Sequence, residues 1–552
     1  MPGRCGYNGG GMPLSPAGLV RWIFASDPAQ GPRRLAARWL FLRALGLIFF
    51  SAFYSFLRQV QGLIGTDGLL PADQYLEAVR QVMGASRYWY VPTLLWLKSD
   101  SHSLLLLSWV GLAASVLLVL NLWPRGTIFV CLAIYLSFIS ALQTFSSYQS
   151  DGMLLSAGFI SLFLAPPGFR PKWGERHPAS RGSLFLLLAV WFTIYFESGI
   201  AKIASGDPEW RNLTAMDDYY QNGPLPTWIG WYAHHLPHWF HVGTAALTLA
   251  LELALVWMAV LPRRFRIVLF WLVTPLQIGI IITSNYAFLN YLVLALGILL
   301  LDDDYLAVLL PRRLRVRARS GPDKESISSA AANRIPGNRW AAARRAFSSS
   351  SFWAGAFLQA WVFYVIAVQL VWMIVPRFPL PTSPVSALEP FRIANQYGLF
   401  AVMTRGRYEI EFQGSNDGGR TWTAYPFRYK PQDPRAAPGI YAPYQPRFDW
   451  NLWFASLDNW QQNRFVIYAE ERLLMGSPSV LELFAGNPFL NAPPTQVRAV
   501  VWQYWFSDRA ERQEGLWWRR ELIGLYAPAI ERAADGKFVI TEFPSPGQRI
   551  RR

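Results

Sequence analysis

The sequence predicts a membrane α-helical bundle of about nine transmembrane helices, followed by a C-terminal β-rich α+β soluble domain. Of the 552 residues, 52% are hydrophobic and 16% are aromatic, but only 16% are charged. An average soluble domain carries about 25% charged residues. Long apolar runs recur as far as Val375, and from Pro376 onward the composition becomes that of a soluble domain.

Nine apolar segments approach the length of about 20 residues that a helix needs to cross a bilayer. They are Trp39–Leu57, Leu104–Leu122, Ile128–Thr144, Met153–Leu164, Leu184–Ile203, Thr244–Leu261, Ile267–Thr283, Ala287–Leu301 and Phe352–Val375. The fourth and eighth are short, so each is either a re-entrant segment or a span extended by polar flanking residues. Counts of eight or ten spans stay open.

The distribution of basic residues predicts the orientation of the bundle. With the N-terminus in the cytoplasm, every loop on that side carries arginine or lysine, as the positive-inside rule requires. This assignment places the loops 58–103 and 204–243 on the outer side. The resulting parts are a cytoplasmic tail (1–36), a polytopic bundle (37–310), a basic flexible cytoplasmic linker (311–350), a last transmembrane helix (351–376) and an extracytoplasmic β-rich domain (377–552).

The formal charge of +16 arises from 51 basic and 35 acidic residues. Because the basic residues adjoin the apolar runs, they indicate contact with the lipid bilayer and disfavour nucleic acid as a partner. The two cysteines, Cys5 and Cys131, exclude a disulfide framework and a thiolate zinc site. No nucleotide or metalloprotease motif occurs, and we predict no cofactor and no metal. The oligomeric state stays open.

Patterns beyond residue 376 predict the secondary structure of the outer domain. Residues 407–415 alternate like a strand, "NDGG" supplies a turn, and 420–430 form a second strand of a hairpin. Residues 450–474 have helical periodicity, and 496–507 with 517–527 are expected to be a further strand pair.

Ionisable residues inside the spans are candidates for function, because they are costly in a membrane. Lys202 lies at the outer end of the fifth span, with Glu197 earlier on the same helix. Either Lys202 is a desolvated base, or it extends to the interface while Glu197 packs against a polar neighbour. Asp151 opens the fourth span, where we expect its carboxylate to cap the helix N-terminus.

Four of the six histidines lie in "WYAHHLPHWFH" (231–241), on the outer side before the sixth span. The stretch is a metal site, an acid–base site or a polar belt at the membrane surface. The spacing of His234, His235 and His241 completes no standard zinc pattern. We therefore expect a rigid, hydrogen-bonding rim above Lys202.

A second candidate surface is the stretch 430–454, which is dense in proline and aromatic residues. It suits recognition of a client protein, but also packing of the outer domain onto its membrane base. Asp449 is a candidate helix cap, and Arg447 could pair with a carboxylate or bind a chain. The residues predicted to bind a client are Tyr444, Arg447, Asp449, Trp450 and Trp453.

Several motifs together resemble the lipase maturation factor family. They include "GLIGTDGLLPA" (62–72), "SDGMLLSAGF" (150–159), "SGIAKIASGDPEWRN" (198–212), "WYAHHLPHWFH", "SNYAFLN" (284–290), "LDDD" (301–304) and "YAPYQPRFDWNLWFASL" (441–457). The matched positions include Asp151, Lys202, Trp210, Arg211, Asp217, Tyr220, His234, His235, Trp239, His241 and Asn285.

This resemblance implies a non-enzymatic chaperone that assists the folding or assembly of secreted clients, which are lipases in animals. Animal members lie in the membrane of the endoplasmic reticulum. The Arg/Ala/Pro-rich composition is that of a bacterial member, so we expect the inner membrane and a periplasmic outer domain.

A weaker resemblance of "FESGIAK" and "EWRNLTAM" to the vitamin K-dependent carboxylase supplies an alternative. It implies an integral-membrane enzyme acting on a lipid-soluble substrate or quinone, with Lys202 as base and Asp217, His234, His235 and His241 nearby. Two departures weaken any acid–base chemistry. In the segment from Asp217 to Pro224, Tyr219, Gln221 and Gly223 stand where the family has His, Glu and Gln, and Ser156 stands where the family has Glu.

Overall fold

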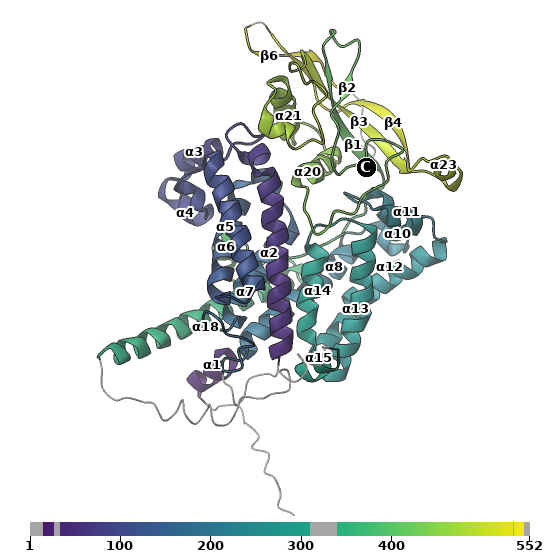
Figure 1. The fold of residues 1–552 in the computed structure, drawn as a ribbon. Helices are drawn as coiled ribbons and strands as arrows, with labels where there is room; N and C mark the ends of the chain where they lie inside the picture. Colours follow the sequence, from purple (N-terminus) through teal and green to yellow (C-terminus); the bar gives the residue numbers. More distant parts are fainter. Residues whose placement is uncertain (1–14, 27–33, 310–338, 534, 546–552) are drawn as a thin grey trace, which may run out of the picture.

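The computed structural model describes residues 15–26, 34–309, 339–533 and 535–545. A helical bundle carries an antiparallel sheet domain at one end (Figure 1). Helices α1 (Pro16–Phe24) and α15 (Asp303–Leu309) lie at the opposite end.

Seven helices of the described residues are long and apolar enough to cross a membrane. They are α2 (Leu35–Ile64), α5 (Ser101–Val119), α6 (Pro124–Ala141), α8 (Arg181–Ala204), α12 (His238–Leu253) continued by the short 3₁₀ segment η4 (Leu255–Val260), α13 (Arg263–Thr283) and α18 (Arg339–Ile374). The other two predicted spans are the shorter helices α7 (Gln149–Leu164) and α14 (Leu289–Gly297), the latter continued by η5 (Ile298–Leu300). The predicted fold class is confirmed, with seven full-length and two short helices.

Small residues let the first helices pack closely. Gly46 of α2 faces Val119 of α5, and a Cβ at Gly46 would lie 2.8 Å from a Val119 methyl carbon. Gly111 of α5 lies similarly against the Phe53 ring. Such close approach of backbones is typical of helix pairs in membranes, where packing drives association.

The N-terminal end of α2 is capped from a distant part of the chain. The backbone amides of Leu35 and Ala36 donate to the two carboxylate oxygens of Asp303, at 2.7 and 2.8 Å. Arg34 donates to the carbonyl oxygen of Leu301 at 2.7 Å. These bonds satisfy helix-terminal groups that would otherwise be buried without partners.

Of the predicted basic linker 311–350, positions 311–338 lie outside the described residues. Positions 339–350 belong to α18, which therefore begins before the predicted span Phe352–Val375. Most of the predicted tail 1–36 is also outside the described residues, but residues 16–24 form α1.

The connections next to the sheet domain are short helices. They are α3 (Ala72–Met83), η1 (Gly84–Ser86), α4 (Arg87–Tyr90), η2 (Leu94–Trp96), η3 (Gln143–Ser146), α9 (Pro208–Arg211), α10 (Ala215–Asn222) and α11 (Trp228–His234). Between α18 and the sheet lie α19 (Ser383–Leu388) and η6 (Glu389–Phe391).

The outer domain contains a six-stranded antiparallel sheet with the order β2-β1-β3-β5-β6, and β4 pairs with β3. The strands are β1 (Arg407–Ser415), β2 (Thr423–Ala424), β3 (Gln496–Phe506), β4 (Trp518–Leu525), β5 (Ala529–Arg532) and β6 (Phe538–Glu542). The accompanying helices are α20 (Arg447–Ser456), α21 (Phe465–Leu474), α22 (Pro478–Leu481) and α23 (Arg509–Gln513).

The predicted strand pair of 496–507 with 517–527 is confirmed as β3 and β4. The predicted hairpin forms, but β2 is only two residues long and pairs at Gln413 and Gly414. The main partner of β1 is instead β3, along all of its length. The single helix predicted over 450–474 is wrong: the largely polar segment 457–464 interrupts it, giving α20 and α21.

Candidate functional site

The residues singled out by sequence gather where the sheet domain meets the bundle. The segment 393–407, which leads into β1, lies across the outer ends of α7 and α8 and the short helices α9 and α10. Side chains of the bundle bond to its backbone: Ser156 to the Ile393 carbonyl (2.6 Å), Glu197 to the Tyr397 amide (2.7 Å), Asp207 to the Met403 amide (2.6 Å) and Asn222 to the Thr404 carbonyl (2.8 Å). The segment is therefore held by specific polar groups.

Arg447 and Asp151 form a buried ion pair across this junction. The two guanidinium nitrogens of Arg447, at the start of α20, lie 2.7 and 2.9 Å from the two Asp151 oxygens in α7. Tyr135 donates its hydroxyl proton to the same carboxylate at 2.6 Å, and Arg447 also donates to the Phe145 carbonyl at 2.7 Å. Asp151 does not cap α7 as predicted, because its oxygens serve this bidentate contact.

Lys202 is buried and does not extend to the membrane surface, so that interpretation is wrong. Its ammonium lies 2.8 Å from a carboxylate oxygen of Glu252 in α12 and donates to the Leu399 carbonyl at 2.9 Å. The Trp210 ring lies beneath the ammonium at 5.1 Å, and its indole nitrogen donates to the Phe400 carbonyl at 2.9 Å. Lys202 thus joins α8, α12 and the segment 393–407.

Asn285 fixes a second loop of the outer domain. Its side-chain oxygen accepts from the amides of Tyr441 (2.6 Å) and Ala442 (2.9 Å), and its amide nitrogen donates to the carbonyls of Leu225 (3.1 Å) and Gly439 (2.9 Å). All of these groups are backbone groups, so a side chain with both a donor and an acceptor is required at this position.

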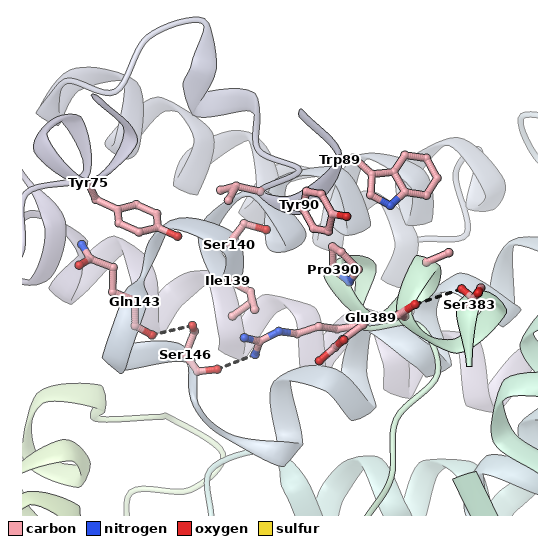
Figure 2. A pocket seen from close by; sticks show the side chains of 14 residues that line it. Tyr75, Trp89, Tyr90, Ile139, Ser140, Gln143, Ser146, Ser383, Glu389 and Pro390 are labelled. Carbon is pink, nitrogen blue, oxygen red and sulfur yellow. Dashed lines mark hydrogen bonds between the residues drawn. The ribbon is translucent and has the colours of Figure 1, made fainter. Parts of the chain in front are cut away.

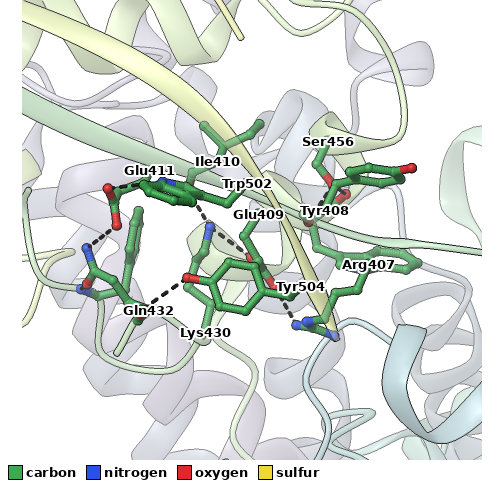
Figure 3. A network of polar contacts seen from close by, with 12 residues as sticks. Arg407, Tyr408, Glu409, Ile410, Glu411, Lys430, Gln432, Ser456, Trp502 and Tyr504 are labelled. Carbon is green, nitrogen blue, oxygen red and sulfur yellow. Dashed lines mark hydrogen bonds and ion pairs between the residues drawn. The ribbon is translucent and has the colours of Figure 1, made fainter. Parts of the chain in front are cut away.

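The sequence interpretation missed Arg407, which opens β1 and is fully buried. It donates to the carbonyls of Gln221 and Pro224, both at 3.0 Å, and pairs with Glu409. Figure 3 shows Glu409 between Arg407 and Lys430, whose ammonium lies 2.9 Å from the carboxylate. A charge in the first position of a predicted strand was the available signal.

Two histidines of the histidine-rich segment contact α10. Nδ1 of His241 lies 2.7 Å from Asp217, and Nδ1 of His238 lies 3.1 Å from the same oxygen. The Tyr220 ring stands 5.7 Å from His241. In the part of the chain that the structure describes, no group of three His, Cys, Asp or Glu side chains is arranged to hold a metal ion.

The remaining histidines of this segment face the end of β3. His234 packs against Phe506 with ring centroids 5.5 Å apart, and His235 stacks on Trp231 at 4.1 Å. The Trp231 indole donates to the Ser507 carbonyl at 3.0 Å. By contrast, Trp239 is 74% exposed.

Protonation of His234 is expected to weaken the folded state. Burial and the neighbouring His235 and His241 lower the pKa of His234 to about 4. Because this lies below the ordinary value of about 6.5, the stabilisation from the neutral ring is complete above pH 6.5 and is lost as the pH falls toward 4. Acidification from pH 7.5 to 5 should cost about 2 kcal/mol at this group.

The variant His234→Phe keeps a ring beside Phe506 but cannot bind a proton. Its unfolding midpoint should therefore fall less between pH 7.5 and 5 than that of the unsubstituted protein, when both are purified at full length. His102→Phe, at an exposed position of α5, is the control and should leave the pH dependence unchanged. Equal acid sensitivity of all three proteins would contradict the assignment.

The five residues predicted to bind a client lie in α20 or just before it. Arg447, Asp449, Trp450 and Trp453 are buried, and Tyr444 is half-buried and contacts Gln59 of α2 at 2.8 Å. Burial raises the pKa of Asp449 to about 7. Asp449 lies in the first turn of α20 without capping it. Three of these side chains, Tyr444, Arg447 and Trp450, contact residues of the bundle. Asp449 and Trp453 are buried in α20.

Arg211 and Arg405 lie at the margin of the junction. Arg211 is exposed at the end of α9. Arg405 pairs with Glu209 at 3.0 Å. Four of the matched motif positions bond directly to the outer domain or to the segment that leads into it: Asp151, Lys202, Trp210 and Asn285. By contrast, Asp217 and Tyr220 of α10 contact His241 of α12.

Two family models match the chain, one in each part of this architecture. Residues 36–308 match the lipase maturation factor transmembrane domain, and residues 393–528 match the lipase maturation factor C-terminal domain. No solved structure matches.

Curated relatives match over nearly the whole chain. Lipase maturation factor 1 of Bos taurus is 32% identical, covering 94% of this chain and 96% of the relative. Lipase maturation factor 1 of Mus musculus is 31% identical, with 97% and 95% covered. Lipase maturation factor 2 of Homo sapiens is 31% identical, with 89% and 82% covered. Both family models match, and the motif residues join the bundle to the sheet domain. The chain is therefore a multi-pass membrane protein and belongs to the lipase maturation factor family.

Proposed function

We propose that this chain assists the maturation of a secreted lipase on the outer side of a bacterial inner membrane. The observation that carries the proposal is the junction, in which residues of the family motifs fasten the sheet domain to the bundle. A domain held in this way stays close to the membrane surface from which a secreted client emerges. The enzymatic alternative is not favoured, because the relatives matched over both domains are maturation factors.

The distribution of charge supports a periplasmic sheet domain. Arg125 lies at the start of α6, Arg170 lies between α7 and α8, and Arg263 and Arg266 lie in the first turn of α13. Arg263 pairs with Asp302 beside α15, and α15 lies at the bundle end remote from the sheet (Figure 1). Positive residues accumulate on the cytoplasmic side of membrane proteins. The N-terminus is then cytoplasmic.

Because four of the five predicted client-binding residues are buried and Tyr444 is half-buried, we infer that they act on the client through the junction. An exposed aromatic cluster on α4 is better placed for direct contact. Trp89 is 47% exposed and Tyr90 57% exposed. They border a hollow of about 570 Å³ between α4, the end of α6 and η6 (Figure 2). Its floor includes Arg392, which donates to the Ser146 carbonyl at 2.7 Å. Aromatic side chains and arginine are enriched where proteins recognise each other.

Loss of this aromatic cluster should lower the specific activity of a secreted lipase. The test replaces Trp89 and Tyr90 together by alanine in a host whose own copy of the gene is deleted. Secreted lipase activity is measured per mass of secreted lipase. We expect a several-fold decrease with unchanged export, because the client would leave without completing its fold.

The matched control is Phe169→Ala, since Phe169 is an exposed aromatic residue at the other end of the bundle. It should leave the specific activity unchanged. Membrane levels of all variants are compared by immunoblot. If deletion of the whole gene leaves specific activity unchanged, the proposed function is wrong. If only the double variant has no effect, the client contact lies elsewhere.

A further inference from the structure

A cavity of about 550 Å³ is lined by residues of α8, α10, α11, α12, α13 and α14. Figure 1 shows these helices together in one half of the bundle. This volume lies within the range of about 300–1,000 Å³ that is usual for small-molecule sites. Lys202 and Glu252 lie in its wall. The cavity is distinct from the aromatic cluster on α4.

Most of the cavity wall is apolar. It includes Ile194, Leu236, Phe240, Leu247, Leu276 and Ile280. Apolar cavities do not hold water well, because water there lacks hydrogen-bond partners. An empty void would also deprive the lining atoms of dispersion contacts. A hydrocarbon chain satisfies both conditions.

The polar side chains in the cavity wall are paired with one another, so the wall carries no net charge. The Lys202 ammonium is balanced by Glu252 at 2.8 Å. Elsewhere in the wall, Gln277 donates to the Tyr195 hydroxyl at 2.9 Å, and Asn290 donates to the Gln277 oxygen at 2.7 Å. These groups offer hydrogen bonds to hydroxyl or ester oxygens but no net charge to balance an ionic head group.

The wall of the cavity that faces the bilayer is formed by α12 and α13. Only 28% of the membrane-spanning stretch of α12 and 17% of that of α13 are buried in the structure. Leu247 of α12 and Ile282 of α13 line the cavity and are 47% and 41% exposed. Pro275 interrupts α13 beside the cavity, and proline removes a helical hydrogen bond and bends the helix. A lipid chain can therefore enter sideways between α12 and α13.

We propose that this cavity binds an uncharged acylglycerol from the surrounding bilayer, with its acyl chain against the apolar wall and its glycerol oxygens toward the paired polar groups. The site is independent of the client surface, since it lies inside the bundle.

Gly279 provides a direct test. It lines the cavity, and a Cβ at this position would meet no atom within 4 Å. Gly279→Leu therefore introduces a bulky side chain at the cavity wall, starting from a Cβ that meets no other atom. Gly243 of α12 also has open space around its Cα, but it does not line the cavity. Gly243→Leu is the matched control, because it adds the same side chain elsewhere on the same half of the bundle.

The experiment uses full-length protein in membranes and a monoacylglycerol that carries a photoreactive diazirine in its chain. After irradiation, labelled peptides are identified by mass spectrometry. We expect labelling of cavity residues of α12 and α13, reduced at least tenfold in Gly279→Leu and unchanged in Gly243→Leu. Equal labelling of both variants, or labelling confined to the outer faces of the helices, would overturn the proposal.

Two further arms test the lipid class and guard against misfolding. A fatty acid and a fatty amine with the same diazirine chain should label the cavity at least several-fold less, and equal labelling by either would refute the uncharged head group. If Gly279→Leu does not give a monodisperse protein, Leu247→Trp blocks the entrance instead and must reduce labelling. These results need no client, so they are distinguishable from failure of the proposed function.

Discussion

Arg447→Met is expected to destabilise the junction by about 3–5 kcal/mol, because it leaves the Asp151 carboxylate buried without its cation. Both side chains are almost completely buried, and their contact is bidentate. The segment 393–407 should then become a substrate for trypsin, which cleaves after arginine when the backbone is accessible. Digestion of full-length protein in detergent, followed over time, measures the loss.

A double substitution separates the ion pair from simple loss of packing. Arg447→Met combined with Asp151→Leu should recover much of the stability, since replacement of both partners by apolar side chains leaves no charge buried alone. Arg519→Met is the surface control, because the exposed Arg519–Glu511 pair at 3.4 Å should contribute less than about 1 kcal/mol. Equal protease sensitivity of the Arg447 and Arg519 variants would contradict the role of the ion pair.

Lys202→Met is expected to produce the second large effect. It would leave Glu252 without its cation inside the bundle and would remove the bond to the Leu399 carbonyl. Removal of one partner from a buried pair costs about 3–5 kcal/mol. The measurement is the temperature at which half of the purified protein loses its monodisperse peak in size-exclusion chromatography.

Lys202→Met with Glu252→Leu should be clearly more stable than Lys202→Met alone. The exposed Lys98 lies 3.0 Å from Asp100, and Lys98→Met should shift the midpoint little. If the double variant is no better than the single one, the loss arises from the Leu399 contact and the Trp210 packing, and the two charges are not coupled.

Much of the architecture followed from patterns along the chain. Apolar runs predicted the bundle, alternation predicted the β3 and β4 pair, and the motifs pointed to the lipase maturation factor family. Hydrophobic length and period are local properties, so they can be read without knowledge of neighbours. The two spans whose sequences are short form the short helices α7 and α14, as their length predicts. The helix expected over 450–474 is instead divided into α20 and α21 by the segment 457–464.

Only some of the residues at the junction could be identified from the sequence. Lys202 and Asp151 were singled out as ionisable residues in membrane segments, but their partners Glu252 and Arg447 were not assigned to them. Glu252 carried the same signal, because it is an acidic residue inside the predicted span Thr244–Leu261. For Arg447 a carboxylate partner was one of two alternatives, and the aromatic surroundings favoured a client-binding surface.

The sequence by itself therefore determined which segments enter the membrane, which fold outside it, and which polar residues are too costly to be incidental. The tertiary structure decided what those residues do: Asp151 binds Arg447 across 296 positions of the chain, and Asn285 holds the loop around Tyr441. The reason is physical. A buried charge or amide must find a partner, but which partner lies within 3 Å depends on how distant helices and loops pack.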